Sequence, residues 1–345
     1  MDKNENLTQN DLILYLHAAA AFQVLHAGVE LKIFELLYES ELNAQKISKK
    51  IKIKEDSLRT LLFGLVSLRL ITVKNDLYQN CEPIKNLFKR NEWALFKSMV
   101  KIQAHIMYIG QIDYVESLKK NKNVGVKRFN GNGATIYERL NYDSKLKNIF
   151  YNYMETYSQY ANPHLIKSVD FSKDKSMLDI GGGGGINAIS IMKNNPNLNI
   201  TIFDLSVAEN LAKKKIKQNG LSNRINFLRG DMFKDEFPKG FDVVSFIHQL
   251  VIWSERENEI LLKKAYSSLN KNGKVIIFSS ISEDDERGSV MAALDTVYFR
   301  AVAAGAGMIY PWKDYEKLLK RAGFKNIKKI RCNTWTPHGI VIGYK

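Results

Sequence analysis

A run of five glycines behind a short apolar segment constrains the fold more than any other feature of this chain. Met177-Leu178-Asp179-Ile180 reads as a buried strand, and Gly181–Gly185 follow it directly. Glycine leaves backbone N–H groups uncovered and adopts conformations closed to other residues, so this run predicts a tight strand-to-helix turn against a ligand. The next apolar segment ends in Asp204, where an acidic side chain binds the hydroxyls of a nucleotide ribose.

Strands and helices alternate beyond residue 171, and this predicts a parallel, doubly wound sheet. Two later segments are spaced like a hairpin, which makes the last strand antiparallel. We therefore expect a seven-stranded α/β domain over 171–345, with strands at 176–180, 199–204, 224–229, 241–247, 274–280, 326–332 and 338–344.

Residues 1–98 predict a small, mostly helical domain of the winged-helix type. Apolar spacing indicates helices within 10–40, at 43–47 and over 54–70, followed by a hairpin at 71–79. A winged helix that reads DNA needs an excess of cations on its second helix. Here acidic neighbours offset the cations, so we expect a dimer-forming module; the residues are Lys54, Glu55, Asp56 and Arg59.

The first helices carry more apolar side chains than a domain of this size can bury, which predicts a homodimer. These side chains cover more than one helical face; they are Leu12, Leu16, Phe22, Val24 and Leu25.

Residues 99–170 read as a helical linker that is rich in aromatic residues and methionine. Core packing and the roof of a substrate pocket both account for this composition, and the sequence leaves the two open. The pocket candidates here are His105, Tyr108, Met154 and Tyr157.

The formal net charge of +15 invites a nucleic-acid reading. Residues 1–98 hold 14 Lys/Arg and 12 Asp/Glu, a net of +2, and the remaining +13 is scattered, so we expect a solvated surface and no nucleic-acid partner.

No apolar stretch reaches the ~18 residues of a membrane span, and the first residues are polar rather than a secretory signal. With only Cys81 and Cys332, no disulfide framework forms, and a cytoplasmic location is expected.

The chain resembles the caffeic-acid-type and antibiotic-tailoring O-methyltransferases, a class I family dependent on S-adenosylmethionine (SAM). The likeness covers nearly the whole chain and implies a winged-helix dimerisation domain before a Rossmann-like SAM-binding domain. The motifs that carry it are the Asp179 glycine turn, Phe203-Asp204-Leu205, Gly230-Asp231-Met232-Phe233, Trp253-Ser254-Glu255 and Ala322-Gly323-Phe324.

The resemblance assigns roles in binding SAM as cofactor. Gly181 and Gly183 let the backbone approach its methionine part, and Asp204 accepts from the ribose hydroxyls. Asp231 accepts from the adenine amino group while Met232 packs on the ring. The same likeness adds three further cofactor-binding candidates, Asp179, Leu205 and Ser158.

The resemblance fails at the catalytic base. The family places a proton-abstracting histidine two residues before the tryptophan, and here that position is Val251. The two carboxylates that hold the histidine fall on Ser279 and near Met308 or Ile309. Val251 and Met308 remain candidates for the substrate pocket.

Three mechanisms stay open from the sequence. An acidic or already nucleophilic acceptor reacts by placement alone, His248 serves as a displaced base, or SAM supports a reaction without methyl transfer. The histidines show no metal-ligand spacing, so no metal is expected.

We expect a SAM-dependent methyltransferase acting on a small aromatic or conjugated secondary metabolite through an O-, C- or N-acceptor. Its alternatives are a non-methylating SAM-binding tailoring enzyme and a SAM-sensing winged-helix transcription factor.

Overall fold

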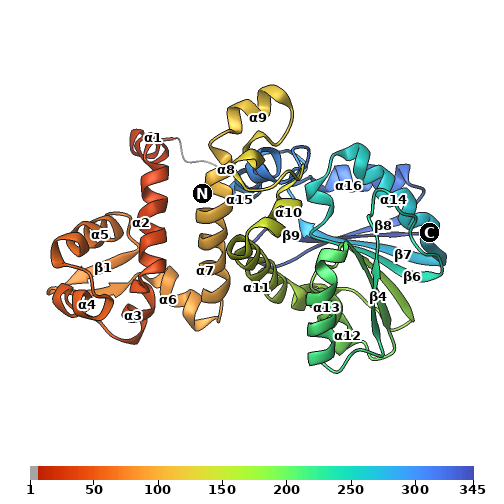
Figure 1. Cartoon of the computed structure of the whole chain (residues 1–345), viewed down its shortest axis with the longest axis horizontal. Coiled ribbons are helices and arrows are strands. Elements are labelled where there is room, and N and C mark those ends of the chain that lie inside the picture. Colours follow the sequence, from red (N-terminus) through yellow and green to blue (C-terminus); the bar gives the residue numbers. More distant parts are fainter. Residues whose placement is uncertain (1–6) are drawn as a thin grey trace. The chain divides into compact units, whose positions relative to one another are not determined.

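The computed structural model describes residues 7–345, which fall into two compact units divided between His105 and Ile106 (Figure 1). The sequence predicted boundaries at residues 98 and 170. The division at 105 leaves the aromatic helices with the second unit, where α11 (Ser144–Ser168) packs on α12 (Ile186–Asn194).

The first unit has the helix, helix, hairpin order predicted for residues 1–98. Its strands β1 (Ile71–Lys74) and β2 (Leu77–Asn80) pair antiparallel. Its helices are α1 (Gln9–Leu16), α2 (Ala18–Glu30), α3 (Ile33–Glu39), α4 (Ala44–Ile51), α5 (Glu55–Ser67), α6 (Glu82–Lys89) and α7 (Trp93–Ile102).

Local signals explain where these helices begin. The Thr8 side chain caps α1 in a reciprocal capping box with Asp11, and Asn43 caps α4 by accepting from the Lys46 N–H. Helices α2, α3 and α5 then bury one apolar core that includes Phe34, Leu62 and Leu65.

Helix α1 buries none of its residues. Leu12 and Leu16 are 55% and 78% exposed, whereas Phe22 and Leu25 on α2 pack partly against the core. Among the described residues no single helix is long and apolar enough to cross a membrane; α1 and α2 satisfy that test only together, as a pair bent by 66°.

The second unit is built on a seven-stranded sheet in the order β5-β4-β3-β6-β7-β9-β8. Only β9 runs antiparallel to its neighbours, as predicted. The strands are β3 (Ser176–Ile180), β4 (Asn199–Asp204), β5 (Ile225–Arg229), β6 (Phe241–Ile247), β7 (Leu269–Ser280), β8 (Lys325–Arg331) and β9 (His338–Tyr344). Strand β7 begins earlier than predicted because Leu269 also pairs with Phe241 across a register shift.

Helices cover both faces of this sheet (Figure 1). Residues of β3 alternate between the two faces: Leu178 joins the core under α14 and α16, and Met177 joins the core under α11, α12 and α13. The remaining helices are α8 (Tyr108–Gln111), α9 (Tyr114–Lys120), α10 (Ile136–Arg139), α13 (Ser206–Gln218), α14 (Glu255–Ser268), α15 (Val290–Tyr298) and α16 (Trp312–Arg321).

Candidate active site

The glycine turn joins β3 to α12 at the carboxyl edge of the sheet, where ligands bind in open parallel sheets. Gly181 and Gly183 have φ angles of +69° and +53°, the left-handed region that favours glycine. Nothing lies within 4 Å of the place where a Gly183 Cβ would stand, so this side of the turn is open. The backbone here can approach a ligand without obstruction.

Asp204 ends β4 beside this turn. Its Oδ2 accepts from the Gly183 N–H at 2.7 Å, and its Oδ1 accepts from the Leu205 N–H at 2.6 Å. Burial raises the pKa of this carboxyl, and the two backbone bonds oppose the shift. Each carboxylate oxygen has further lone pairs, so Asp204 can hold the turn and still accept from a ribose.

Asp179 lies beneath the turn, fully buried. Its Oδ1 accepts from the Ser245 hydroxyl at 2.6 Å, while Oδ2 has no hydrogen-bond partner and would contact any side chain placed at Gly182. Burial raises its pKa to about 7. The two carboxylates form an acceptor set beside the open backbone at Gly183, and acceptors of this kind fit the ammonium and the ribose hydroxyls of SAM.

Asp231 and Met232 follow β5 on a loop fixed by its own backbone. Asp231 Oδ1 accepts from the Phe233 N–H at 3.0 Å, and the Phe233 ring packs edge-on against Trp253 with centroids 4.7 Å apart. The Lys264 ammonium donates to the carbonyls of Met232 and Phe233 at 3.1 and 3.2 Å. The loop is therefore fixed beside Asp204, whose carbonyl accepts from the Gly230 N–H at 3.0 Å, and its adenine-binding role stays a prediction.

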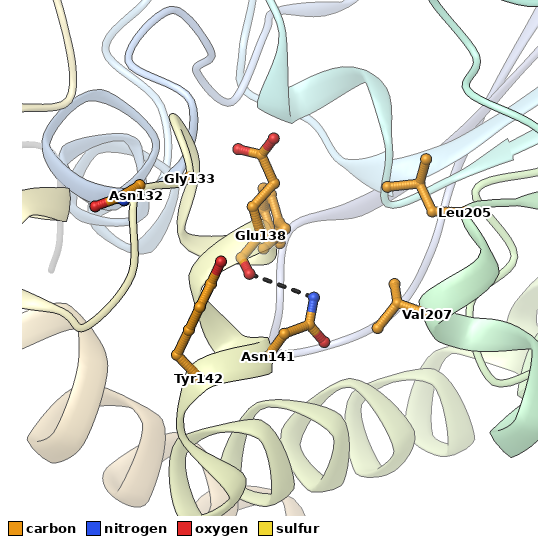
Figure 2. A pocket seen from close by; sticks show the side chains of 8 residues that line it. Asn132, Gly133, Glu138, Asn141, Tyr142, Leu205 and Val207 are labelled. Atoms are coloured by element: carbon orange, nitrogen blue, oxygen red, sulfur yellow. Dashed lines mark hydrogen bonds between the residues drawn. The ribbon is translucent and has the colours of Figure 1, made fainter.

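A pocket of about 440 Å³ opens beside Leu205, the residue after Asp204. Figure 2 shows Leu205 and Val207 on one side of it and Asn132 and Gly133 on the other. Between them, the Asn141 amide donates to the Glu138 carbonyl at 3.3 Å. The pocket adjoins the expected cofactor site from the side of α10.

His248 stands at the end of β6 with a φ of +57°, a conformation that costs a non-glycine residue ~1–3 kcal/mol and that clusters at functional sites. Its ring is buried, and its Nε2 has no hydrogen-bond partner. Burial alone lowers the pKa of His248 to about 4, so the imidazole is neutral at pH 7.

The structure encloses His248 in aromatic rings. The Tyr157 ring lies 5.0 Å from it and the His338 ring 5.2 Å. The Tyr157 hydroxyl pairs with the Ser280 hydroxyl at 2.8 Å, and His338 Nδ1 pairs with the Thr336 hydroxyl at 2.6 Å. His338 Nε2, like that of His248, lacks a partner. Two buried neutral imidazoles thus lie side by side, each with an Nε2 that has no hydrogen-bond partner among the described residues.

The position of the family base contains no group that can accept a proton. Val251 is buried in the short turn Leu250–Ile252, in one apolar cluster with Ile309 and Ala292. Ser279 is buried in β7, and Met308 packs against the neighbouring core.

The other predicted residues divide between the two units. Ser158 is buried on α11, and Met154 stands one turn before it on the same helix. Tyr108 lies in α8 of the second unit and His105 in the first, so the pocket role of His105 stays a prediction.

His105 does stand beside other potential metal ligands within the first unit. Ligand atoms of His26, Glu30 and His105 lie within 4.8 Å of one another, although the Lys101 ammonium is 3.2 Å from the Glu30 carboxylate and already neutralises it. The expected absence of a metal stays a prediction.

Three residues of the site went unnoticed in the sequence. Gln249 donates its amide to the Gly181 carbonyl at 2.9 Å and so ties the end of β6 to the glycine turn. Lys264 and His338 come from α14 and β9, far along the chain from the loops they contact. Of the three, only Gln249 could have been found from the sequence, because it is adjacent to the candidate base His248.

Comparisons with known proteins agree with this arrangement. Residues 113–325 match the O-methyltransferase domain, and residues 13–89 match the O-methyltransferase dimerisation domain. L-tyrosine C(3)-methyltransferase of Streptomyces lavendulae is 41% identical over 98% of this chain and 93% of its own. A 3-hydroxy-5-methyl-1-naphthoate 3-O-methyltransferase of Streptomyces sahachiroi is 25% identical, and the match covers 94% of this chain and 91% of that protein.

Solved structures show the same fold. The SAM-dependent methyltransferase SibL in its apo form is 37% identical, with a TM-score of 0.85 over 98% of this chain and 99% of that one. Human N-acetylserotonin methyltransferase in complex with SAM is 22% identical, with a TM-score of 0.82 over 100% of this chain and 99% of that one.

Proposed function

Because this chain belongs to the O-methyltransferase family, and is a SAM-dependent methyltransferase of small aromatic acceptors, we propose that it methylates a ring carbon of a phenol. The carbon is the one ortho to the hydroxyl, and L-tyrosine is the acceptor to test first, since a 41% identical relative is named for that reaction. The observation that carries the proposal is that the family base position is the buried Val251, while the ionisable residue that follows β6 is the weakly basic His248.

The weakness of this base favours carbon over oxygen. A phenol has a pKa near ~10, so full transfer of its proton to an imidazole of pKa about 4 costs roughly 8 kcal/mol. Methylation at oxygen needs that proton removed early. Attack by the ring carbon instead turns the hydroxyl into a protonated carbonyl, a strong acid that a weak base deprotonates readily.

His248 then acts as the acceptor of the hydroxyl proton. Its buried Nε2 accepts a hydrogen bond from the phenol O–H and takes the proton as the new carbon–carbon bond forms. His338, beside it, offers a second neutral nitrogen for the ring proton that must leave to restore aromaticity. Burial lowers the pKa of His338 as well, with His248 adding to the shift, so both rings start neutral.

Bound SAM supplies an electrophilic methyl group on a sulfonium. Asp204, the open backbone at Gly183, and the loop of Asp231 and Met232 would hold it, and we assign Asp179, Ser158 and Leu205 to the same cofactor site. We assign Tyr157, Met154 and Tyr108 to the acceptor side, where the rings that enclose His248 would exclude water from the reacting atoms.

The dimerisation domain supports a homodimer as the working unit. The exposed apolar residues of α1 are the surface we assign to that interface. Cys81 and Cys332 are both free thiols, which agrees with a cytoplasmic location. We include no nucleic-acid partner, because the acidic residues of α5 offset its cations.

The test is the position of the methyl group in the product. The enzyme is incubated with SAM and L-tyrosine, and the product is analysed by mass spectrometry and proton NMR. Carbon methylation removes one aromatic proton signal and leaves the hydroxyl free. A methoxy signal, or SAM left unconsumed with every phenol offered, contradicts the proposal. O-methyltyrosine is the control, and it is expected to be inert because it has no hydroxyl proton to lose.

A further inference from the structure

The loop that leads into β9 holds the imidazole of His338 on one side. The Thr336 hydroxyl lies 2.6 Å from His338 Nδ1, and among the described residues it is the hydrogen-bond partner of that ring. Both residues are buried, Thr336 at 0% and His338 at 3% exposed. The other ring nitrogen, Nε2, has no partner, so the imidazole is anchored at one nitrogen and free at the other.

Backbone hydrogen bonds place Thr336 relative to the imidazole. The His338 N–H donates to the Thr336 carbonyl at 2.7 Å, which closes a three-residue turn around Pro337. Proline suits this turn because its ring fixes φ close to the roughly −75° that an inverse γ-turn requires. The Pro337 carbonyl accepts from the Ile281 N–H at 2.8 Å, and the Thr334 hydroxyl donates to the Thr336 carbonyl. The position of the Thr336 side chain is therefore set by the backbone rather than by the ring that it contacts.

Three rings pack around the His338 imidazole. Their centroids lie 4.7 Å (Tyr157), 5.2 Å (Phe278) and 5.2 Å (His248) from its own. His338 also pairs across the sheet with Ser280, whose hydroxyl bonds the Tyr157 hydroxyl at 2.8 Å. The imidazole cannot turn far without losing these contacts, so it stays beside His248.

The hydrogen bond at Nδ1 decides what Nε2 can do. Neutral imidazole carries one N–H, and the partner of one nitrogen selects which of the two nitrogens is protonated. Nε2 keeps the lone pair that takes a proton only when Nδ1 carries the hydrogen and donates it to the Thr336 oxygen. Once Nε2 has taken a proton both nitrogens are donors, and the buried Nδ1–H of the cation still needs an acceptor. The Thr336 oxygen stands at the place of that acceptor.

We propose that Thr336 is a positioning residue for the loss of the ring proton: its hydroxyl oxygen accepts from His338 Nδ1 and leaves His338 Nε2 free as the base. The inference rests on the proposed function, because a ring proton is lost only when carbon is methylated. The C–H bond at the methylated carbon breaks, its electron pair restores the aromatic ring, and the proton goes to His338 Nε2. The oxygen of the acceptor regains a proton from His248, and the proton on His338 passes to solvent as the site reopens.

This role predicts a kinetic signature that a packing role does not. Methyl transfer to carbon is irreversible and precedes the loss of the ring proton, so a slower proton step lowers kcat and leaves kcat/KM unchanged. A misplaced acceptor or cofactor instead slows methyl transfer itself and lowers kcat/KM. When C–H cleavage limits the rate, an acceptor deuterated at that carbon also reacts more slowly than the ordinary one.

Thr336→Val removes the hydroxyl and keeps the shape of the side chain. On L-tyrosine we expect kcat to fall about 10–100-fold, the usual effect of losing one hydrogen bond to a charged group, with kcat/KM within about twofold. In this variant and not in the wild type, L-tyrosine deuterated at both ring positions ortho to the hydroxyl should turn over more slowly than L-tyrosine. Thr336→Ser keeps the hydroxyl and should restore kcat and abolish the isotope effect. Calorimetric binding of S-adenosylhomocysteine reports that each variant is folded, and Thr336→Ala takes the place of Thr336→Val if valine prevents folding.

Thr334→Val is the matched control, because the Thr334 hydroxyl bonds the Thr336 carbonyl in the same loop rather than the imidazole. It should leave kcat unchanged and show no isotope effect. An unchanged kcat in Thr336→Val, or an equal loss of kcat and kcat/KM without an isotope effect, overturns the proposal. A wild-type product methylated at oxygen overturns the proposed function as well, whereas a ring-methylated product together with either of those results removes the role of Thr336 alone.

Discussion

His248 combines a strained backbone, a buried ring and an unused nitrogen. The burial that makes it a weak base also keeps it neutral, and a proton acceptor must be neutral before it can act. Because the folded-state pKa lies below the ~6.5 of free histidine, the unfolded chain binds the proton more readily between about pH 4 and 6.5. His248 therefore lowers the stability of the fold as pH falls through this window.

The same pKa sets the expected pH dependence of catalysis. With SAM saturating, so that the ionisation of Asp179 does not limit cofactor binding, we expect kcat/KM for the phenol to be level from about pH 5 to 8 and to fall toward pH 4 as His248 is protonated. His248→Asn should reduce it ~10²–10⁴-fold, since asparagine tolerates the left-handed backbone but cannot take the proton. The measurement is the pH–rate profile of both proteins on one acceptor.

A loss below about tenfold in His248→Asn would show that placement alone drives the reaction. In that case the residual rate should follow the ionisation of the phenol itself and rise toward its own pKa.

Asp204 accepts a hydrogen bond from the backbone of the glycine turn and is also the residue expected to bind the ribose of the cofactor. Asp204→Ala should weaken S-adenosylhomocysteine binding by roughly 1.5–3 kcal/mol, or ~10–100-fold, because a charge-assisted contact to the ribose and the restraint on Gly183 are lost together. Titration calorimetry on wild type and variant gives the difference. Unchanged affinity would leave Asp204 with only its structural bonds to the Gly183 and Leu205 N–H groups.

At the scale of the element, the glycines of the turn have two different reasons to lack a side chain: one packs against the protein and the other leaves room for a ligand. A side chain at Gly182 would overlap Asp179, whereas one at Gly183 would meet no protein atom. Both Gly183 and Gly220 are left-handed with open surroundings, but Gly220 lies after α13, away from the carboxyl edge of the sheet.

Gly183→Ala and Gly220→Ala form a matched pair. Each should lower stability by ~1–2 kcal/mol through the left-handed backbone alone. Only Gly183→Ala should also weaken S-adenosylhomocysteine binding, by at least tenfold, because the methyl group occupies the space that the ligand needs. Thermal unfolding and calorimetry measure the two effects, and equal cofactor affinity in both variants would exclude close approach at Gly183.

At the scale of the whole molecule, α1 exposes a continuous apolar surface: Leu12, Ile13, Leu14, Tyr15 and Leu16 are each 49–78% exposed. A helix so apolar and so little buried is typical of an interface. The dimerisation domain over residues 13–89 includes most of it.

We expect light scattering at micromolar concentration to give about twice the 39.5 kDa mass of the chain. The double variant Ile13→Lys with Leu16→Lys should shift the protein toward the monomer, because two cations cannot be buried unpaired in an apolar interface. Leu118→Lys, at an exposed leucine on α9, is the control and should stay dimeric. A wild-type monomer with full activity would contradict the assignment.

Much of this architecture was predictable because it depends on local patterns. The alternation of strand and helix segments along the chain placed the strands of the second unit, with β3, β4, β6 and β9 at the predicted bounds, and the glycine run located the turn. The winged-helix order of the first unit followed from helical spacing and one short hairpin. These signals survive in a single sequence since neighbouring residues alone decide them.

The sequence by itself therefore determined the fold class, the motifs expected to hold the cofactor and the loss of the usual base at Val251. Only the tertiary structure decided that His248 is a neutral, weak base that lies beside His338, and that Gln249 and Lys264 fix the loops. The physical reason is that burial, pKa and pairing arise from residues brought together from distant parts of the chain.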